Sequence, residues 1–259
     1  MDGPSNRTGA RVPEPNGLLP AESLRQVVQN VTDRTRNPFG MVPDCDRFVP
    51  GYGDANADFH VIGDHPGVHG GVDGGVPFTE MPWSEAFLAA LDAAGLVDLR
   101  SAPTDSKEST GANAVADPAP STDRPPYRPV NTFFSYLHMC VSDEPPDPGS
   151  YADMERFFDA ELRAIAAHVL LPVGARATEH VLEQYTARAW KTTVDMDALH
   201  AEELLGSGWL VVPIKEPSAW TTADADRLVS ALEELQSTDF RRESDLGRFL
   251  PGGETYLVR

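Results

Sequence analysis

The chain has 259 residues, 41% of them hydrophobic, which is enough for one large α/β domain or two small ones around a real core. No apolar run approaches the ~20 residues that a membrane span requires, and the N-terminus has no apolar signal-peptide core, so we expect a cytoplasmic monomer without a membrane partner. The formal net charge is −19, from 40 Asp and Glu against 21 Lys and Arg, which in dilute salt disfavours a nucleic-acid partner.

Hydrophobic periodicity predicts the elements of the first half. Residues 1–19 are rich in Gly, Pro and Asn and are expected to be disordered, and a helix is expected at 20–36. Residues 58–63 predict a strand that ends in a glycine-rich loop, and the apolar pattern after it predicts a helix ending near Gly95. The stretch 101–129 consists mainly of Ser, Thr, Asp, Ala and Pro and predicts a flexible insertion.

The second half alternates short apolar strands with amphipathic helices. Strands are expected at 131–140, 168–174 and 209–214, and helices at 151–167, 174–185, 196–206 and 222–235. This alternation predicts an α/β protein in which residues 20–259 form a single domain, a three-layer α/β/α sandwich with a short central parallel sheet. Such sheets place their sites at the carboxyl ends of strands, so the loops after Gly63, Met139 and Ile214 are the candidate site.

The loop after Gly63 is the most informative segment. It is rich in glycine up to Gly75, so its bare backbone can approach a ligand closely, although a flexible surface loop is the alternative. It contains neither the GK[ST] of a phosphate-binding loop nor the dinucleotide fingerprint. His60, His65 and His69 lie nearby with Asp64 and Asp73, but no zinc signature matches, so we expect no metal and interpret His65 and His69 as loop polarity.

Four motifs occur in an order that resembles a known family. VIGDHPG, then GVPF, then a helix ending in DAAGL resemble the opening of the uracil-DNA glycosylase superfamily, closest to its family-4 branch, which typically reads GEAPG or GEGPG and then GRPF. TFFSYLHMC, the segment HVLLPVGARATEHVL and VVPIKEPSAW are similar to later motifs, the last at the family's HPS loop. Each motif alone is weak, but four in order over roughly residues 40–236 are specific.

The resemblance implies excision of a base from DNA. The target nucleotide is flipped into a pocket, stacks on an aromatic ring and is read by side-chain amides, while hydrogen-bond donors stabilise the departing uracil anion. Asp64 matches the family's acidic position and Phe78 its stacking phenylalanine. Tyr136 falls where the family has the base-reading Asn, and Glu216 falls at the His of the HPS loop.

Two of these positions depart from the family. A carboxylate at Glu216 would repel a uracil anion, and Tyr136 cannot read a pyrimidine edge with two hydrogen bonds. His65, beside Asp64, is a secondary catalytic candidate. Further residues are expected to line the same pocket: Gly63, Pro66, Gly67, Ser218 and Lys215, the last as a donor offset by one position.

Two function hypotheses follow from the resemblance. The first is a divergent DNA glycosylase that hydrolyses the N-glycosidic bond of an altered base, with Asp64, Glu216 and His65 as catalytic residues. The second is a non-catalytic superfamily member that binds nucleic acid or a nucleotide. A partner outside DNA metabolism is a third possibility without a specific signal. All of them require the glycine turn at Gly63 and the Glu-Pro-Ser turn to face each other across one cavity.

The resemblance also raises the question of an iron–sulfur cluster. Family-4 enzymes hold a 4Fe–4S cluster with four cysteines, and Cys45 and Cys140 fall at two of these positions. Val42 and Met154 occupy the other two, where we expect them to pack as apolar filling. Two thiolates do not satisfy a four-cysteine site, so no cofactor is expected. If the two cysteines take these family positions, a Cys45–Cys140 disulfide is possible by proximity, but it is disfavoured in a reducing cytoplasm.

The acidic, Asp-rich composition with only three lysines is typical of halophilic, haloarchaeal-type proteins, in which surface carboxylates maintain hydration. In molar salt the Debye length falls to ~3 Å, so the net charge then neither supports nor excludes DNA as a partner.

We expect the fold to be less stable at low salt because its carboxylates then repel one another unscreened. Thermal unfolding in about 0.1 M and about 3 M KCl should show a clearly higher Tm at the higher concentration. A Tm that does not change between the two would contradict the halophilic interpretation.

Overall fold

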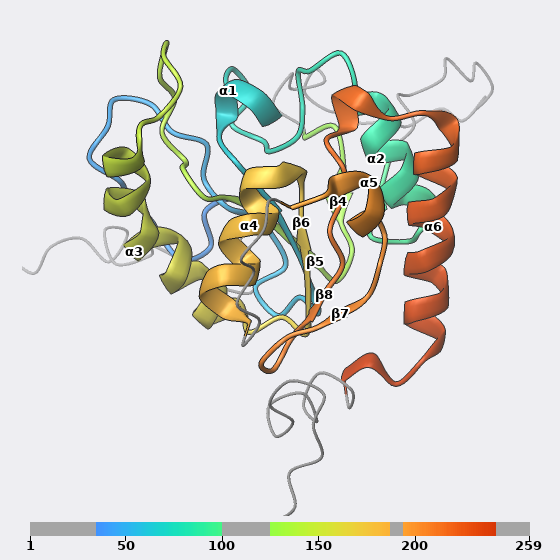
Figure 1. The fold of residues 1–259 in the computed structure, drawn as a ribbon. Helices are drawn as coiled ribbons and strands as arrows, with labels where there is room; N and C mark the ends of the chain where they lie inside the picture. The colour runs from blue at the N-terminus through green and yellow to red at the C-terminus, as the bar shows by residue number, and fades with distance from the viewer. Residues whose placement is uncertain (1–34, 100–124, 187–193, 242–259) are drawn as a thin grey trace, which may run out of the picture. The chain divides into compact units, whose positions relative to one another are not determined.

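A computed structural model describes residues 35–99, 125–186 and 194–241. Six strands form one sheet in the order β1-β5-β2-β6-β8-β7 (Figure 1). Their bounds are β1 Tyr52–Gly53, β2 Phe59–Gly63, β5 Thr132–Tyr136, β6 Val169–Pro172, β7 Leu204–Leu205 and β8 Leu210–Val211. The four inner strands are parallel, which confirms the predicted α/β fold, whereas β1 and β7 pair antiparallel at the two edges.

Helices cover both faces of this sheet. They are α1 Pro66–His69, α2 Ser84–Ala93, α3 Pro148–Ile165, α4 Gly174–Tyr185, α5 Met196–Leu199 and α6 Thr222–Ser237, with a 3-10 turn, η3, at Pro217–Ala219. In Figure 1, α3 and α4 lie on one face and α2 and α6 on the other. Helix α3 begins three residues before its predicted start, because the Asp147 side chain caps it by accepting from the Ser150 N–H and Pro148 is suited to the first turn.

Alternate residues of the buried strands point to opposite layers. On β2, Val61 packs with the cluster that includes Phe87 and Leu232, from α2 and α6. Its neighbour Ile62 packs with the cluster that includes Phe158, from α3. Both β2 residues are fully buried, as expected for a strand covered on two faces.

Two further predicted boundaries are wrong. The helix predicted at 196–206 ends at Leu199, and Leu204–Leu205 instead form β7, which returns alongside β8 through a turn closed by Gly206 N–H donating to the Trp209 carbonyl. The predicted insertion ends earlier than 129, because Arg128–Pro129 form β4 against β3 (Val97–Asp98). The predicted disorder at 1–19 and most of the predicted 20–36 helix and 101–129 insertion lie outside the described residues.

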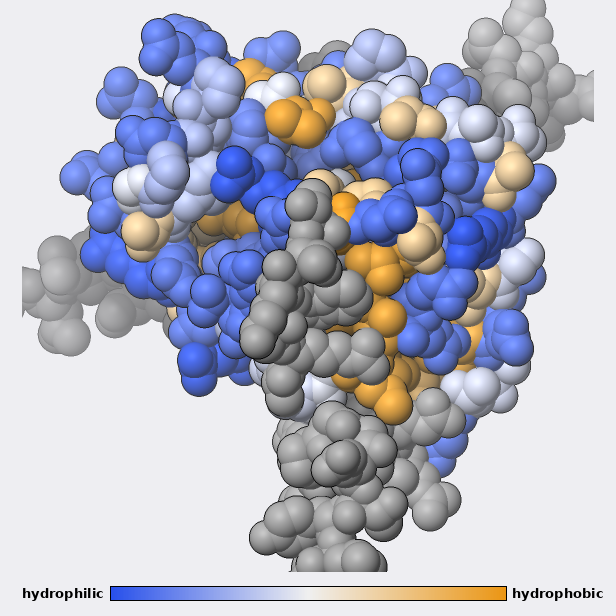
Figure 2. Space-filling model, viewed as in Figure 1, coloured by the Kyte–Doolittle hydropathy of each residue, from blue (hydrophilic) through white to orange (hydrophobic). Residues whose placement is uncertain are grey.

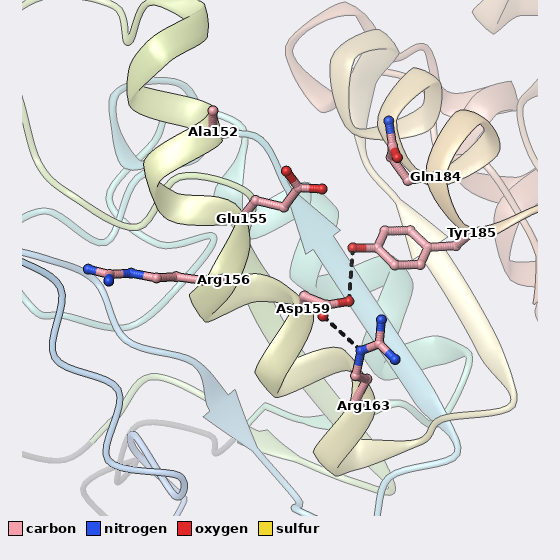
Figure 3. Close-up of a pocket in the computed structure, with 7 residues that line it drawn as sticks. All are labelled: Ala152, Glu155, Arg156, Asp159, Arg163, Gln184 and Tyr185. Atoms are coloured by element: carbon pink, nitrogen blue, oxygen red, sulfur yellow. Dashed lines mark hydrogen bonds and ion pairs between the residues drawn. The ribbon is translucent and has the colours of Figure 1, made fainter.

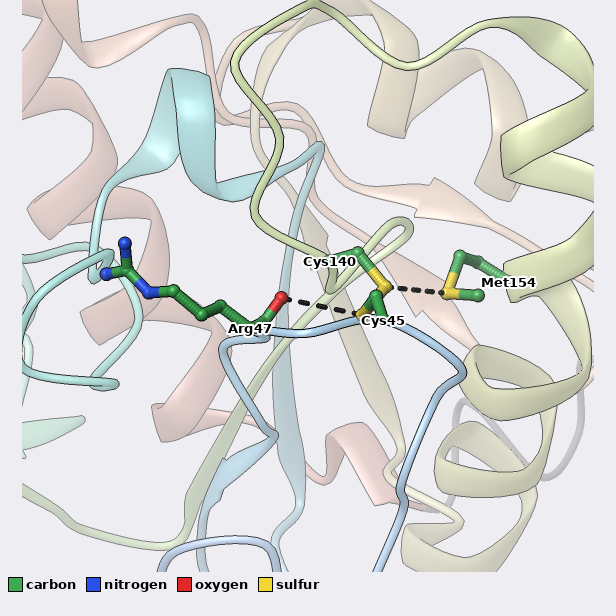
Figure 4. Close-up of a disulfide and its surroundings, with 4 residues drawn as sticks. All are labelled: Cys45, Arg47, Cys140 and Met154. Carbon is green, nitrogen blue, oxygen red and sulfur yellow. Dashed lines mark hydrogen bonds between the residues drawn. A yellow bond between two sulfur atoms is a disulfide. The ribbon is translucent and has the colours of Figure 1, made fainter.

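Residues 35–51, which we call the strap, run beside the segment that follows β5. Val49 N–H donates to the Met139 carbonyl at 2.8 Å, and Val141 N–H donates to the Arg47 carbonyl at 2.9 Å. This pairing places Cys45 next to Cys140, and the two form a disulfide (Figure 4). The expectation that they would stay unpaired is therefore wrong, because the strap brings together two residues 95 positions apart.

The residues at the four cluster positions do not fit an iron–sulfur group. The two cysteine sulfurs are bonded to each other, and the third position holds the thioether of Met154, whose Sδ lies 3.8 Å from Cys140 Sγ. Met154 is buried as predicted, but Val42 is 70% exposed, so the prediction that it packs as apolar filling is wrong. Four thiolates are therefore not available here.

The face drawn in Figure 2 is largely hydrophilic, in keeping with the acidic composition. Within the described ranges, no helix has the length and apolar character needed to cross a bilayer.

Two ionisable side chains lie fully buried between the sheet and α3. Glu161 is 0% exposed, neither carboxyl oxygen makes a well-formed hydrogen bond to the described residues, and burial raises its pKa to about 8, with only a weak opposing contact from the Gly51 backbone. His60 is equally buried; its Nε2 lies 2.7 Å from Ser135 Oγ, and burial lowers its pKa to about 3. Both groups are therefore neutral near pH 7.

Substituting Glu161→Gln should stabilise the protein in alkaline solution. The folded pKa of about 8 lies above the ordinary value of 4.5, so between pH 4.5 and pH 8 the folded state binds more protons than the unfolded state, and the free energy of unfolding falls as pH rises through this range. The variant lacks this loss and should be more stable by on the order of 3 kcal/mol above pH 8, with little difference near pH 4.5. Denaturant unfolding at several pH values measures this difference in stability. Glu155→Gln, at an exposed position on the same helix, is the control. Equal pH profiles for Glu161→Gln and the parent would contradict the raised pKa of Glu161.

Candidate active site

The predicted loops do meet at the carboxyl edge of the sheet. Gly63, the last residue of β2, is in register with Tyr136, the last residue of β5. On the other side, Val173 after β6 bridges to Ile214, which brings Glu216 to the same edge. The glycine turn and the Glu-Pro-Ser turn are therefore in contact, as the sequence predicts, because parallel strands end together.

His69, the last residue of α1, fills the space between these two turns. Its side chain is 0% exposed, and its ring stacks on Phe78 with 5.2 Å between centroids and 29° between planes. Nδ1 accepts from the Asp64 backbone N–H at 2.8 Å, and Nε2 lies 3.1 Å from Glu216 Oε2. The imidazole therefore has a polar partner at each nitrogen and an aromatic ring against its face.

These partners fix the protonation of His69. A backbone N–H can only donate, so Nδ1 carries no proton. The proton of the neutral ring is then on Nε2, which donates to the Glu216 carboxylate. In this arrangement Glu216 acts as an acceptor.

Tyr136 lies on the β5 side of His69, with 6.2 Å between the two ring centroids. It is 1% exposed, and burial raises the pKa of its phenol far above the ordinary value. Its hydroxyl donates to the His69 carbonyl at 2.8 Å, lies 3.1 Å from the Gly70 carbonyl, and accepts from Phe78 N–H at 2.8 Å. The phenol is thus used inside the protein to hold the two ends of the glycine-rich loop.

The glycines of this loop permit the close packing. Gly70 has φ +80°, and a Cβ there would lie 1.9 Å from the Thr79 carbonyl oxygen, so the two ends of the loop can approach only because the side chain is missing. At Gly63 a Cβ would lie 2.6 Å from the Tyr136 ring and 2.8 Å from His69 Nδ1. The glycine-rich loop is therefore folded tightly around the chain's own side chains.

Asp64 lies beside this pocket on the side of α3 and α4. Its carboxylate accepts from the Tyr151 hydroxyl and lies 3.7 Å from Arg176 Nε, and the Arg176 guanidinium also lies 4.7 Å from the Tyr151 ring centroid. Burial, together with the hydrogen bond to Asp64, raises the pKa of Tyr151. His65 is half-buried; burial lowers its pKa, opposed by Asp64, and its Nδ1 accepts from Gly67 N–H as the cap of α1.

The remaining predicted site residues are placed as follows. Lys215 directs its ammonium to Asp197, with Nζ to Oδ1 at 2.6 Å, and to Asp224, while its neighbour Glu216 faces His69. Pro66 is buried, whereas Gly67 and Ser218 are exposed. The structure thus brings Asp64, Phe78, Tyr136 and Glu216 together around His69 and turns Lys215 elsewhere.

Glu216 has a second oxygen without a partner. Oε1 is buried and makes no hydrogen bond within the part of the chain that the structure describes. Oε2 lies against Gly174, where a Cβ would come within 2.8 Å of it. The carboxylate therefore sits at the start of α4, where the helix dipole favours a negative charge.

A groove of about 400 Å³ lies elsewhere, between α3 and α4 (Figure 3). Its polar lining includes the Asp159–Arg163 ion pair of α3, and the hydroxyl of Tyr185, from α4, points to Asp159. This groove does not include any residue of the predicted site. Among the described residues, no three His, Cys, Asp or Glu side chains gather in a way that would hold a metal ion.

Comparison with known families agrees with this geometry. The model of the uracil DNA glycosylase superfamily matches residues 50–236, which is most of the chain. The chain belongs to the uracil DNA glycosylase superfamily. Members act on DNA, so membership indicates a DNA glycosylase-like function and associates the protein with DNA repair. A comparison with curated proteins found no significant match.

The sequence interpretation missed the most important residue of this superfamily pocket. His69 was assigned to loop polarity, and it is fully buried instead. The available signal was its position directly before Gly70 and Gly71, where the chain can turn sharply and pack its own ring against the end of β2. Tyr127 was also missed; it is 1% exposed and its hydroxyl donates to the Pro77 carbonyl next to Phe78.

Substituting His69→Ala should leave a slot that free imidazole can refill. We expect the free energy of unfolding to fall by about 2–4 kcal/mol, because a stacked ring and two buried hydrogen bonds are removed. Because imidazole would bind only the folded variant, adding it should raise the Tm of His69→Ala.

The control is His180→Ala, a half-buried position on α4, whose Tm should not respond to imidazole. Equal responses of the parent and the His69→Ala variant would show that the ring does not occupy a separate slot.

Proposed function

We propose that this protein is a DNA-binding member of the uracil DNA glycosylase superfamily that does not excise uracil, because its base pocket is occupied by its own His69. The observation that carries the proposal is the position of that ring. The resemblance expects a base to stack on Phe78 and to face the side chains at positions 136 and 216. His69 stacks on Phe78, lies 6.2 Å from the Tyr136 ring and contacts Glu216.

The hydrogen-bonding groups around the pocket also do not match those that uracil excision requires. A departing uracil anion needs hydrogen-bond donors, but the Glu216 carboxylate is an acceptor. The Tyr136 hydroxyl donates to the His69 carbonyl, so it is already engaged. The closest resemblance, to the family-4 branch, stays a prediction, and these two positions are where the chain departs from it.

Exposed arginines around the closed pocket support a nucleic-acid partner. Arg36 and Arg47 each donate to a carbonyl of the glycine-rich loop, at Gly74 and Val72, and Arg176 lies beside Asp64. All three side chains are exposed and lie at the carboxyl edge of the sheet. Guanidinium groups in such positions suit contacts to phosphate oxygens, which position a protein on DNA without reading sequence.

A glycosylase for a different base is the second candidate. Glu216 Oε1 is a buried acceptor without a partner in the described residues, and Asp64 stays in the acidic position of the family. An exocyclic amine on a base would satisfy such an acceptor, so an amino-bearing base is the substrate class that this candidate favours. It requires His69 to leave the pocket first.

The parent protein should bind DNA without producing abasic sites. Oligonucleotides that contain uracil, or one of a panel of altered bases, are incubated with the full chain in molar KCl and then cleaved at abasic sites. We expect no abasic product, and equal affinity for uracil-containing and matched thymine-containing DNA. His69→Ala, with an open pocket, should prefer DNA with a mispaired cytosine, whose exocyclic amine suits the Glu216 acceptor, over DNA with a mispaired thymine by about tenfold, the effect of roughly 1.4 kcal/mol.

The control variant is His69→Ala with Phe78→Ala, which removes the stacking ring and should lose that preference. Abasic product from the parent would support the second candidate. The absence of DNA binding at any KCl concentration would overturn the proposed function.

A further inference from the structure

We propose that the Cys45–Cys140 disulfide is a thiol-exchange site that a dithiol reductant opens, and that its opening loosens the closed base pocket. This deepens the proposed function, because it names how the occupancy of the pocket by His69 is regulated.

The two cysteines differ in access. Cys45 is half-buried on the strap, whereas Cys140 is 8% exposed and lies against Met154 (Figure 4). Four more sulfur-bearing or aromatic residues complete the cluster around them: Met41, Met139, Phe48 and Phe157. An incoming thiolate therefore reaches the Cys45 sulfur more easily, and the buried Cys140 sulfur is the leaving group.

The strap connects this disulfide to the glycine-rich loop. Two residues after Cys45, the Arg47 guanidinium donates to the Val72 carbonyl at 2.7 Å and lies 3.6 Å from Asp73. Arg36, from the same strap, donates to the Gly74 carbonyl at 2.7 Å. Two arginines on one covalently fixed segment thus hold two carbonyls of the loop, at Val72 and Gly74.

The loop in turn carries the side chains that close the pocket. His69 and Phe78 lie on either side of its glycines, and the Tyr136 hydroxyl joins the two by donating to the His69 carbonyl and accepting from Phe78 N–H. The Gly71 N–H donates to the Thr79 carbonyl at 3.0 Å, which fixes the same base of the loop. Loosening the strap would weaken the contacts of Arg36 and Arg47 with the loop. Only the hydrogen bonds of the Tyr136 hydroxyl and of Gly71 N–H would then hold the loop that carries His69.

The exchange step balances with a dithiol as co-reactant. One thiolate of the dithiol attacks Cys45 Sγ, the Cys45–Cys140 bond breaks, and Cys140 leaves as a thiolate that takes up a proton. The second thiol of the reductant then attacks the mixed disulfide and releases Cys45. The reductant ends as a disulfide, and the protein as two thiols.

Without the covalent link the strap keeps its backbone pairing with residues 139–141 but gains conformational freedom. A disulfide that closes a loop of 95 residues restricts the unfolded chain strongly, so reduction should lower the Tm by about 10 °C. The loop should respond more than the sheet, because local openings start where buried contacts are few.

Hydrogen exchange followed by mass spectrometry tests the connection. The full chain is compared in molar KCl before and after reduction by dithiothreitol, with thiol alkylation used to verify the reduction. Peptides that contain the Asp64 and Phe78 amides should exchange about tenfold faster in the reduced protein, while β6 peptides keep their rate. This readout needs no DNA, so it stands or fails independently of the proposed function.

Two variants distinguish a specific connection between the strap and the loop from a general destabilisation of the protein. Arg47→Ala keeps the disulfide but removes one contact to the loop, and it should speed exchange at Asp64 and Phe78. Arg156→Ala, whose guanidinium lies 4.6 Å from the Phe157 ring centroid on α3, should not. Unchanged exchange of these amides in a fully reduced protein, or the same acceleration in β6, would overturn the proposal.

Glutathione disulfide tests which sulfur is the point of attack. In Cys140→Ser the half-buried Cys45 should form a mixed disulfide readily, and in Cys45→Ser the buried Cys140 should react at least about tenfold more slowly. Equal rates for the two variants would overturn the assignment of Cys45 as the exchange site.

Discussion

A single buried imidazole, that of His69, fills the space between the glycine turn and the Glu-Pro-Ser turn and so keeps this site closed. His69 has Phe78 against its face, the Asp64 N–H at one nitrogen and the Glu216 carboxylate at the other. A polar ring buried without these partners would be costly, so the position of His69 depends on all three. Conversely, each partner would be left exposed or unsatisfied if the ring moved out, and the Asp64 N–H and Glu216 Oε2 would both lose their bonds.

The two departures from the superfamily pattern form one coherent change. A tyrosine at position 136 is long enough to reach the far ends of the glycine-rich loop, which an asparagine at the end of β5 is not. A carboxylate at position 216 accepts the proton that the His69 tautomer presents. Tyr136 and Glu216 thus both suit an internal imidazole.

The fold could be predicted from sequence more fully than the site. The alternation of strands and helices indicated the parallel sheet, because apolar runs such as that around Val61 must be covered on both faces. It also located the meeting of Gly63 with Glu216 at one edge. The resemblance placed Cys45 near Cys140, but no local pattern in the sequence shows that they bond, because the strap's pairing with residues 139–141 is a long-range contact. The sequence could not place His69 either, because a histidine in a glycine-rich loop is equally compatible with solvent and with burial.

The tautomer of His69 is the most direct test of this account. Long-range ¹H–¹⁵N correlation spectra of the ¹⁵N-labelled parent, with the signal assigned by its loss in His69→Gln, report which ring nitrogen carries the proton. The account predicts a neutral ring protonated at Nε2, with that proton protected from exchange by its bond to Glu216. A doubly protonated ring, or one whose tautomers average rapidly in contact with solvent, would contradict it.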